Sequence, residues 1–347
     1  MPITSLMQRL NLHTPIMQAP MAGASNAEFV AAACHAGALG SLGAGMMSPA
    51  AIHAEINQIK ALTDKPFNIN LMILSNELSE RYSAAMPKWL SNKYQALGVT
   101  PAIDDKPAQD FTKQLQVLLD NPVPVASFTF GVLESTQVKA LHDVGSLVVG
   151  TANNVAEVQA WADVGADAVV VQGVEAGGHQ GGWTNETAKR YATFELLKLT
   201  KSGDIKLPLI AAGGIATAQS VAQALIGGAD LVAVGTAFLT THESPISPLW
   251  QEQLFKATGA DTRLTRLFSG KLARGVVNDY MREFADIDGA IRHADIPLYP
   301  TMNAMTKSLR AYGAKCGDVN LMSLWAGMAV ADCRDESVLD LMARLLG

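Results

Sequence analysis

One short device recurs along this chain and constrains the fold more than any other feature. A helical pattern ends at glycine, and an apolar run follows directly. Glycine is common just after a helix because it adopts the left-handed conformation there, and parallel strands need helices to connect them. The repetition therefore predicts βα units around a parallel sheet and favours a barrel. The four copies lie at 36–40, 144–146, 164–168 and 227–231.

Eight apolar runs with strand character complete this pattern, and helical patterns opened by Ser, Asn or Thr separate several of them. Eight parallel strands with alternating helices define a (β/α)8 TIM barrel of the α/β class. The expected strands are 16–19, 39–42, 67–72, 123–127, 147–149, 168–171, 209–212 and 231–234, and the expected helices include 26–35, 49–61, 135–143, 155–164 and 218–226.

The chain of 347 residues is longer than the roughly 250 of a typical single barrel. Residues 74–122 interrupt the alternation, and we interpret them as helical decoration after the third strand. Prolines break up the helical segments beyond residue 244. We therefore expect a barrel over 1–244, a smaller, mainly helical substrate or lid domain over 245–320, and a C-terminal helix within 321–347 that packs back on the barrel.

Composition excludes several classes of protein. The net charge of -6 lacks the basic excess typical of nucleic-acid binding. The three cysteines are widely spaced with no C-x-x-C pair, which argues against disulfides and structural zinc, and no other metal-ligand pattern stands out. The N-terminus lacks a secretory signal, and no uncharged apolar stretch reaches about 18 residues. We expect a cytoplasmic protein with no membrane segment.

The apolar run 168–171 leads into a loop that holds a histidine, His179, among five glycines at 173, 177, 178, 181 and 182. So many glycines allow the backbone to approach a planar or anionic ligand closely. His179 is thus the candidate proton-handling group. Among the other histidines, those at 13, 35, 53 and 142 have ordinary surface or packing positions, while His242 and His293 remain candidates for the rim of the site.

Two further loops have the composition of a phosphate site. Gly213 and Gly214 follow the seventh expected strand, and Gly235 and Thr236 follow the eighth. Either loop alone could equally be a plain tight turn, but TIM barrels often bind phosphate after strands seven and eight. Their joint position favours a phosphate.

Other candidate ligands lie at the ends of strands one, three and six. The first strand ends in small residues beside Met21, which leaves room for a flat ring system. Asn68 and Asn70 share one face of the third strand, and Gln172 ends the sixth. An amide in an apolar strand usually exists to form hydrogen bonds, and Asn70 is the better ligand candidate because it lies nearer the strand end.

Taken together, these motifs resemble the FMN-dependent nitronate monooxygenases, formerly called 2-nitropropane dioxygenases. The resemblance covers nearly the whole chain. It is carried by 15–23, 68–71, 127–131, 172–179, 211–215, 235–239, 268–275 and 324–327.

The resemblance implies a set of site residues. FMN would lie at the barrel mouth, and the residue matching His179 handles the proton in that family. Tyr299 and Lys307 would bind substrate from the appended domain. Many members have Gln where this chain has Met328. The implied FMN ligands are Met21, Ala22, Gly23, Asn70, Gln172, Gly177, Gly213, Gly214, Ala233, Val234, Gly235 and Thr236.

The implied reaction is oxidation of an alkyl nitronate, such as propionate 3-nitronate, by O₂. It proceeds through an anionic flavin semiquinone to a carbonyl product and nitrite or nitrate. The small-molecule nitronate and O₂ are then the partners, with a homodimer as one option for assembly. Two alternatives stay open: an NAD(P)H-dependent flavin reductase of the enoyl-acyl-carrier-protein or quinone type on the same scaffold, and a flavin-free, phosphate-binding isomerase or synthase.

Overall fold

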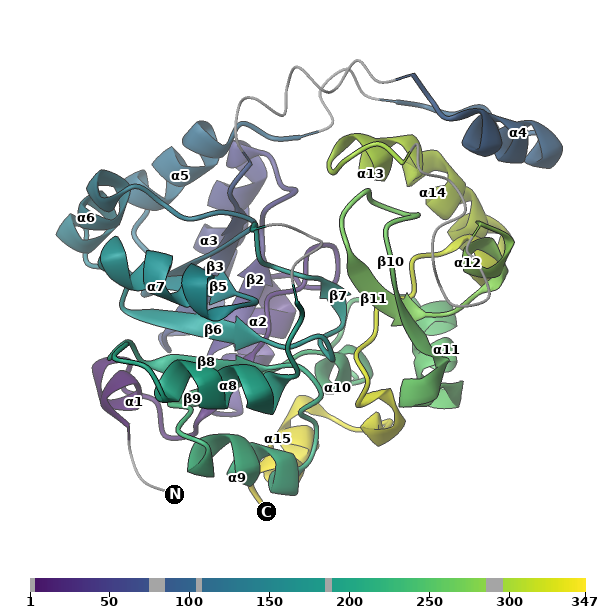
Figure 1. Cartoon of the computed structure of the whole chain (residues 1–347). Coiled ribbons are helices and arrows are strands. Elements are labelled where there is room, and N and C mark those ends of the chain that lie inside the picture. Colours follow the sequence, from purple (N-terminus) through teal and green to yellow (C-terminus); the bar gives the residue numbers. More distant parts are fainter. Residues whose placement is uncertain (1–3, 75–84, 104–107, 185–188, 285–295) are drawn as a thin grey trace.

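Eight parallel strands form a nearly closed barrel in the computed structural model, which describes residues 4–74, 85–103, 108–184, 189–284 and 296–347 (Figure 1). They follow the order β1-β9-β8-β6-β5-β4-β3-β2. A bridge between Met17 and Leu39 joins the two end strands. The predicted TIM barrel and all eight predicted strands are confirmed. The strands are β1 (Ile16–Gln18), β2 (Gly40–Gly43), β3 (Phe67–Met72), β4 (Val125–Thr129), β5 (Leu147–Ala152), β6 (Ala168–Gln172), β8 (Leu209–Ala212) and β9 (Leu231–Val234).

Helices surround this barrel, and side-chain caps define where several begin. Asn26, Ser48 and Asn154 each accept a hydrogen bond from a backbone N–H in the first turn of the following helix. The surrounding helices are α2 (Ala27–His35), α3 (Pro49–Leu62), α5 (Phe111–Asp120), α6 (Ser135–Asp143), α7 (Val155–Asp163), α8 (Thr193–Lys201), α9 (Ala218–Ile226) and α10 (Thr236–Leu239).

The barrel interior changes from apolar to polar along the strands. At the amino ends of the strands, Met17, Leu39 and Val125 pack against Leu6 and Met7 of α1 (Ser5–Arg9), which closes that end of the barrel. At the carboxyl ends of the strands the interior side chains are polar. They include Asn70, Ser127, Thr151 and Gln172. The polar end is the one where TIM barrels place their active sites.

A second, smaller part of the molecule contains a three-stranded antiparallel sheet in the order β10-β11-β7. Its strands are β10 (Thr262–Thr265), β11 (Ala273–Val276) and β7 (Gly178–His179). We expected region 245–320 to be mainly helical and did not predict strands in it. The first two strands have only four residues each, include arginines, and lack the apolar alternation that signals a strand.

Helices make up most of the rest of this smaller part. They are α11 (Pro248–Lys256), α12 (Asp279–Phe284), α13 (Thr301–Met305) and α14 (Lys307–Cys316), with short 3₁₀ turns at Gly259–Asp261, Val319–Leu321 and Val330–Asp332.

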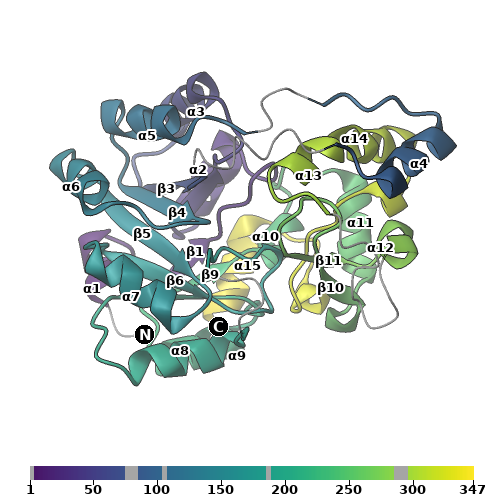
Figure 2. The same cartoon turned by 45° about the horizontal axis from the view of Figure 1, so that its top comes forward.

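Helix α4 (Lys88–Leu97) belongs spatially to this smaller part, although five of the eight barrel strands follow it in sequence. Figures 1 and 2 both show it away from the barrel and close to α14. Trp89 packs on Tyr280 and Phe284, and the Tyr94 hydroxyl donates to the Met305 carbonyl at 2.7 Å. The stretch after strand three is therefore helical as expected, but its two helices divide between the two parts, with α5 on the barrel.

Helix α15 (Val338–Leu346) returns to the barrel at the C-terminus. It contacts α9, α10 and α2, so it takes the place of the eighth barrel helix. Leu341 and Leu345 are fully buried in the core between strands and helices. No helix in the described ranges is both long and apolar enough to cross a bilayer.

Candidate active site

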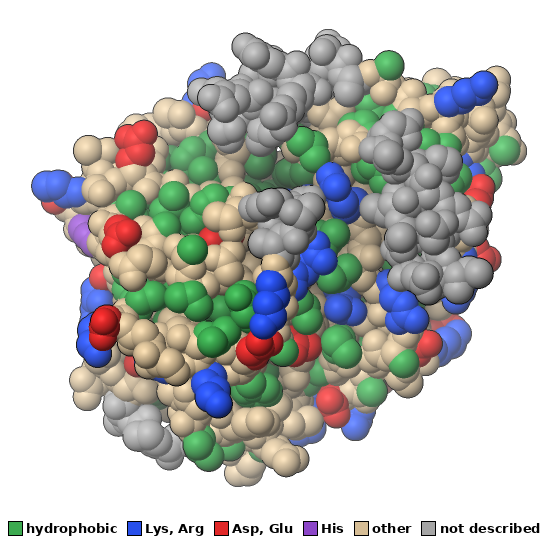
Figure 3. All heavy atoms as spheres, viewed as in Figure 1, with side chains coloured by type: hydrophobic (Ala, Val, Ile, Leu, Met, Phe, Trp, Pro, Cys, Tyr) green, Lys and Arg blue, Asp and Glu red, His purple; other side chains and the backbone are tan. Residues whose placement is uncertain are grey.

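His179 lies where the barrel and the smaller part meet. The loop after β6 leaves the barrel and pairs as β7 with β11, with Ala273 opposite His179 and Arg274 opposite Gly178. This pairing ties the backbone of His179 to a rigid sheet, although its surroundings are rich in glycine. Several Lys and Arg side chains lie on the surface where the barrel and the smaller part adjoin (Figure 3).

Aromatic rings enclose the imidazole on three sides. Ring centroids of Phe130, Tyr299 and Trp325 lie 5.7, 5.5 and 5.6 Å from that of His179. Phe130 adopts a φ of 73°, which is unusual for a bulky residue. Strained backbone of this kind is often found at functional sites, and here it directs an aromatic ring at His179.

Two cations lie close enough to influence His179. Lys271 Nζ donates to the Gly182 carbonyl at 2.9 Å and lies 4.7 Å from the Phe130 ring centroid. Arg310 donates to Asn303, to the backbone oxygen at 2.8 Å and to Oδ1 at 2.9 Å. Burial, followed by the charges of Lys271 and Arg310, lowers the pKa of His179 to about 3. The imidazole is therefore neutral at ordinary pH.

The amides at the barrel mouth form a connected network. Gln172 accepts from the Gly181 N–H at 2.7 Å and donates to the His179 carbonyl at 3.2 Å, so it shapes the histidine loop directly. Asn70 donates to Ser127 Oγ at 2.9 Å on the interior of β3 and β4. Asn68, deeper in the barrel, is fully buried with both amide atoms unpartnered within the described residues.

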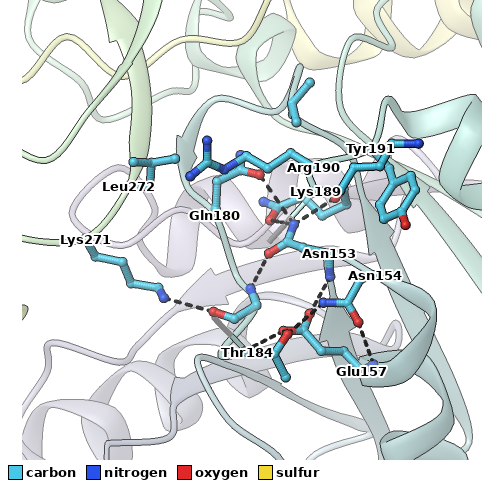
Figure 4. A pocket seen from close by; sticks show the side chains of 13 residues that line it. Asn153, Asn154, Glu157, Gln180, Thr184, Lys189, Arg190, Tyr191, Lys271 and Leu272 are labelled. Carbon is cyan, nitrogen blue, oxygen red and sulfur yellow. Dashed lines mark hydrogen bonds between the residues drawn. The ribbon is translucent and has the colours of Figure 1, made fainter. Parts of the chain in front are cut away.

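A polar pocket opens beside this network (Figure 4). In Figure 4, Lys271 reaches across to the backbone of Gly182, and Asn153 joins Gln180 to the same loop. Both Gln172 and Lys271 line this pocket, so it adjoins the histidine site.

The loops after β8 and β9 have the geometry expected of a phosphate site. Gly213 and Gly214 have φ values of 113° and 68°, which side-chain-bearing residues resist. Within the described ranges, the N–H groups of Gly214 and Gly235 have no protein acceptor. A Cβ on Gly235 would make only ordinary van der Waals contacts, the nearest at 3.6 Å to Ala19 Cβ, so the loop is not tightly covered. Free backbone donors on two neighbouring loops fit an anionic group.

The other residues predicted around FMN take different positions. Met21, Ala22 and Gly23 follow β1, and a Cβ on Gly235 would lie 3.9 Å from Met21 Sδ, so the β1 and β9 loops adjoin. Ala233 points into the barrel, whereas the Val234 side chain packs outward against the helices, so only the backbone of Val234 could face a ligand.

Gly177 and Thr236 hold the chain segment at Gly327 and Met328 against the carboxyl end of the barrel. A Cβ on Gly177 would lie 2.6 Å from the Gly327 nitrogen, so only glycine permits this approach. Thr236 Oγ1 accepts from the Gly327 N–H at 2.9 Å, and the Met328 N–H donates to the Glu175 carbonyl at 2.9 Å. The Met328 side chain itself is 43% exposed.

The two predicted substrate residues differ in placement. Tyr299 is buried against His179 and Phe130, and its hydroxyl donates to Met72 Sδ at 3.2 Å. Lys307 is exposed on the first turn of α14, and its role stays a prediction.

Sequence reasoning missed three residues that the tertiary structure brings to His179: Ser269, Lys271 and Arg310. The 268–275 motif includes the first two, but nothing in its pattern indicates a partner 90 residues away. Of the two rim histidines, His242 instead contacts Asp335 at 3.1 Å, and His293 lies outside the described residues. Within the described part of the chain, no cluster of three or more His, Cys, Asp or Glu side chains could hold a metal.

The fold and this site define a barrel enzyme whose reacting groups lie at the carboxyl ends of its strands. The sequence model of the nitronate monooxygenase family matches residues 4–347. The chain belongs to this family, whose members are flavin enzymes, and the protein is an oxidoreductase.

Similar proteins agree with this assignment. A probable nitronate monooxygenase of Staphylococcus haemolyticus is 33% identical over 98% of this chain and 95% of its own length. One from Staphylococcus aureus is 34% identical over 93% and 91%. The solved structure of a nitroalkane oxidase from Streptomyces ansochromogenes superposes with a TM-score of 0.87 at 34% identity, covering 99% of this chain and 96% of that one. FabK from Thermotoga maritima, at 24% identity and a TM-score of 0.76 over 100% and 96%, shares the fold.

Proposed function

We propose that this protein is an FMN-dependent nitronate monooxygenase. It would oxidise alkyl nitronates such as propionate 3-nitronate with O₂ to a carbonyl product and nitrite or nitrate. The observation that carries this proposal is a neutral imidazole at the barrel mouth, enclosed by aromatic rings and flanked by Lys271 and Arg310. Such a site suits an anionic substrate and a flat cofactor.

The residues present fit a flavin mononucleotide. Gly214 and Gly235 would hold its phosphate through free backbone N–H groups, with Gly213 in the same loop as Gly214. Asn70 and Gln172 would hydrogen-bond the ring system. The remaining predicted ligands line the adjoining β1 and β9 loops. When bound, FMN would supply electron transfer between the nitronate and O₂.

The side chains of this chain would supply binding and charge. Lys271 and Arg310 would stabilise the negative charge of the nitronate, an effect that is strong where water is excluded. Phe130, Tyr299 and Trp325 would provide that exclusion. His179 would handle the proton of the substrate, because it is the titratable group that these residues enclose.

A His179→Asn substitution tests the proposed role of His179. We expect turnover of the neutral nitroalkane nitroethane to fall by about 10² or more while FMN stays bound, because the amide keeps polarity but loses the nitrogen that would accept the substrate proton. Steady-state kinetics and the visible spectrum of the purified variant provide both readouts. His35→Asn, on the exposed surface of α2, is the matched control and should have full activity. Undiminished turnover in His179→Asn would remove His179 from the mechanism.

An anaerobic titration tests the proposed reaction itself. We expect the purified protein to show a flavin spectrum that changes on addition of propionate 3-nitronate and does not change with NADH. Bleaching by NADH alone would place the protein among the flavin reductases. A colourless protein that does not bind added FMN would favour the flavin-free isomerase or synthase.

A further inference from the structure

The side chain of Ser269 is fully buried between the candidate proton handler and its own loop. Its Oγ lies 2.8 Å from His179 Nε2 and 3.1 Å from the Lys271 carbonyl oxygen. The Lys271 N–H points at the same oxygen from 3.4 Å. One hydroxyl therefore makes three contacts, and it has only one proton to donate.

The direction of these hydrogen bonds follows from the chemistry of the partners. A carbonyl oxygen can only accept, so the contact with Lys271 uses the single hydroxyl proton of Ser269. The contact with His179 then needs a proton from the imidazole, which means that Nε2 carries hydrogen. The hydroxyl now donates once and accepts twice, which is its full capacity.

The second nitrogen of His179 has the opposite character. A neutral imidazole has one ring proton, and burial together with Lys271 and Arg310 keeps this ring neutral by lowering its pKa to about 3. With the proton on Nε2, Nδ1 holds a lone pair. Nδ1 makes no hydrogen bond to any residue in the described ranges, and the residue as a whole is only half-buried. It is thus available to a ligand.

We propose that Ser269 is a positioning residue that holds His179 in its Nε2–H tautomer, so that Nδ1 meets the substrate as a proton acceptor and never as a donor. With a neutral nitroalkane, the carbon–hydrogen bond next to the nitro group would break, its electron pair would remain as the nitronate, and the proton would move to Nδ1. With a preformed nitronate, Nδ1 has no proton to offer, and the anion would depend on Lys271 and Arg310.

Nitrogen NMR of the histidine rings tests the tautomer without turnover. The protein is produced with ¹⁵N-labelled histidine and measured as purified, and the His179→Asn variant assigns the signal. We expect wild-type His179 to show a protonated Nε2 and an unprotonated Nδ1. Protonation at Nδ1 in the wild type would overturn the proposal.

Two substitutions at Ser269 test its role in holding that tautomer. Ser269→Ala removes the acceptor, so the His179 signals should move toward a mixture of tautomers. Ser269→Thr keeps the hydroxyl and should keep the wild-type pattern. An unchanged pattern in Ser269→Ala would show that Ser269 does not set the tautomer. Circular dichroism of each variant checks that it is folded. If a variant does not fold, the NMR measurement on the wild type still tests the tautomer.

Kinetics separate positioning from structural damage. The mechanistic consequence rests on the proposed function, so the substrates are nitroethane and its nitronate. We expect Ser269→Ala to lower kcat/KM for nitroethane by about 10- to 100-fold. The kcat/KM for the nitronate should change by no more than a few-fold, because only nitroethane has a proton that Nδ1 of His179 must accept. Equal losses with both substrates would contradict the proposal. A wild type that oxidises neither would defeat the proposed function, whereas the NMR result would still decide the tautomer.

Discussion

At the residue scale, His179 couples the stability of this protein to pH. Its pKa in the folded protein is about 3, against an ordinary value near 6.5. Below about pH 6.5 the unfolded chain therefore binds a proton that the folded protein refuses until about pH 3. The free energy of unfolding should fall with decreasing pH across this window.

Denaturant unfolding of the purified protein at a series of pH values measures this slope. The His179→Asn variant should lose most of it between about pH 6.5 and 5, above the range where ordinary carboxylates titrate. His35→Asn should keep it. A wild-type slope that survives in His179→Asn would show that the imidazole is not the group responsible.

Residue types also show how far sequence reasoning could reach into the site. His179, Asn70 and Gln172 were identifiable because polar side chains at the ends of apolar strands are conspicuous. Ser269, Lys271 and Arg310 were not, because serine and basic residues are common on surfaces. Their importance comes from the partners that folding brings to them.

At the element scale, the contact between β5 and α7 depends on a missing side chain. A Cβ on Gly150 would lie 2.1 Å from the ring of Trp161, which is fully buried. The Trp161 Nε1–H also donates to the Thr151 carbonyl at 3.2 Å, which holds the ring over the strand. The helix thus packs closer to the sheet than any larger residue would allow.

A Gly150→Ala substitution should be strongly destabilising for this reason. We expect a loss of about 1–3 kcal/mol or more in the free energy of unfolding, because the rigid ring cannot move aside cheaply. Gly203→Ala is the matched control, since a Cβ there has no atom nearer than 3.6 Å. Thermal and denaturant unfolding of both variants compare them, and equal stability would refute the close-packing argument.

Elements differed in how well they could be predicted. Long apolar or periodic segments such as β3 and α3 were recognisable because their pattern repeats over many residues. The two residues of β7 and the four of β10 carry too little pattern, and their strand conformation comes from pairing with β11. Short strands of this kind depend on their partners more than on their own residues.

At the scale of the whole molecule, the last helix completes the barrel after a long excursion of the chain. Leu341 of α15 is fully buried in the barrel core, whereas Leu339 on the same helix is 66% exposed. Arg344 donates to the Ala216 carbonyl and pairs with Glu336, which adds a polar anchor. The barrel core is therefore completed by a helix that follows the smaller part in the chain.

Leu341→Ala should consequently destabilise the entire barrel. We expect about 2–5 kcal/mol of lost stability from the cavity, and almost none for Leu339→Ala. Denaturant unfolding followed by fluorescence and by circular dichroism measures both variants. If α15 unfolds together with the barrel, fluorescence and circular dichroism should change at the same denaturant concentration. A separate transition at lower denaturant would show that α15 unfolds independently.

The barrel, its strands and the loop that carries His179 could be predicted from the residues alone, because periodicity and glycine placement act locally. The division into 1–244, 245–320 and 321–347 stays a prediction. Three features could not be predicted in this way: β7 joins β11, α4 packs with the smaller part, and Ser269 and two cations lie around His179. These contacts join segments far apart in the chain, and their free energy depends on the complete fold.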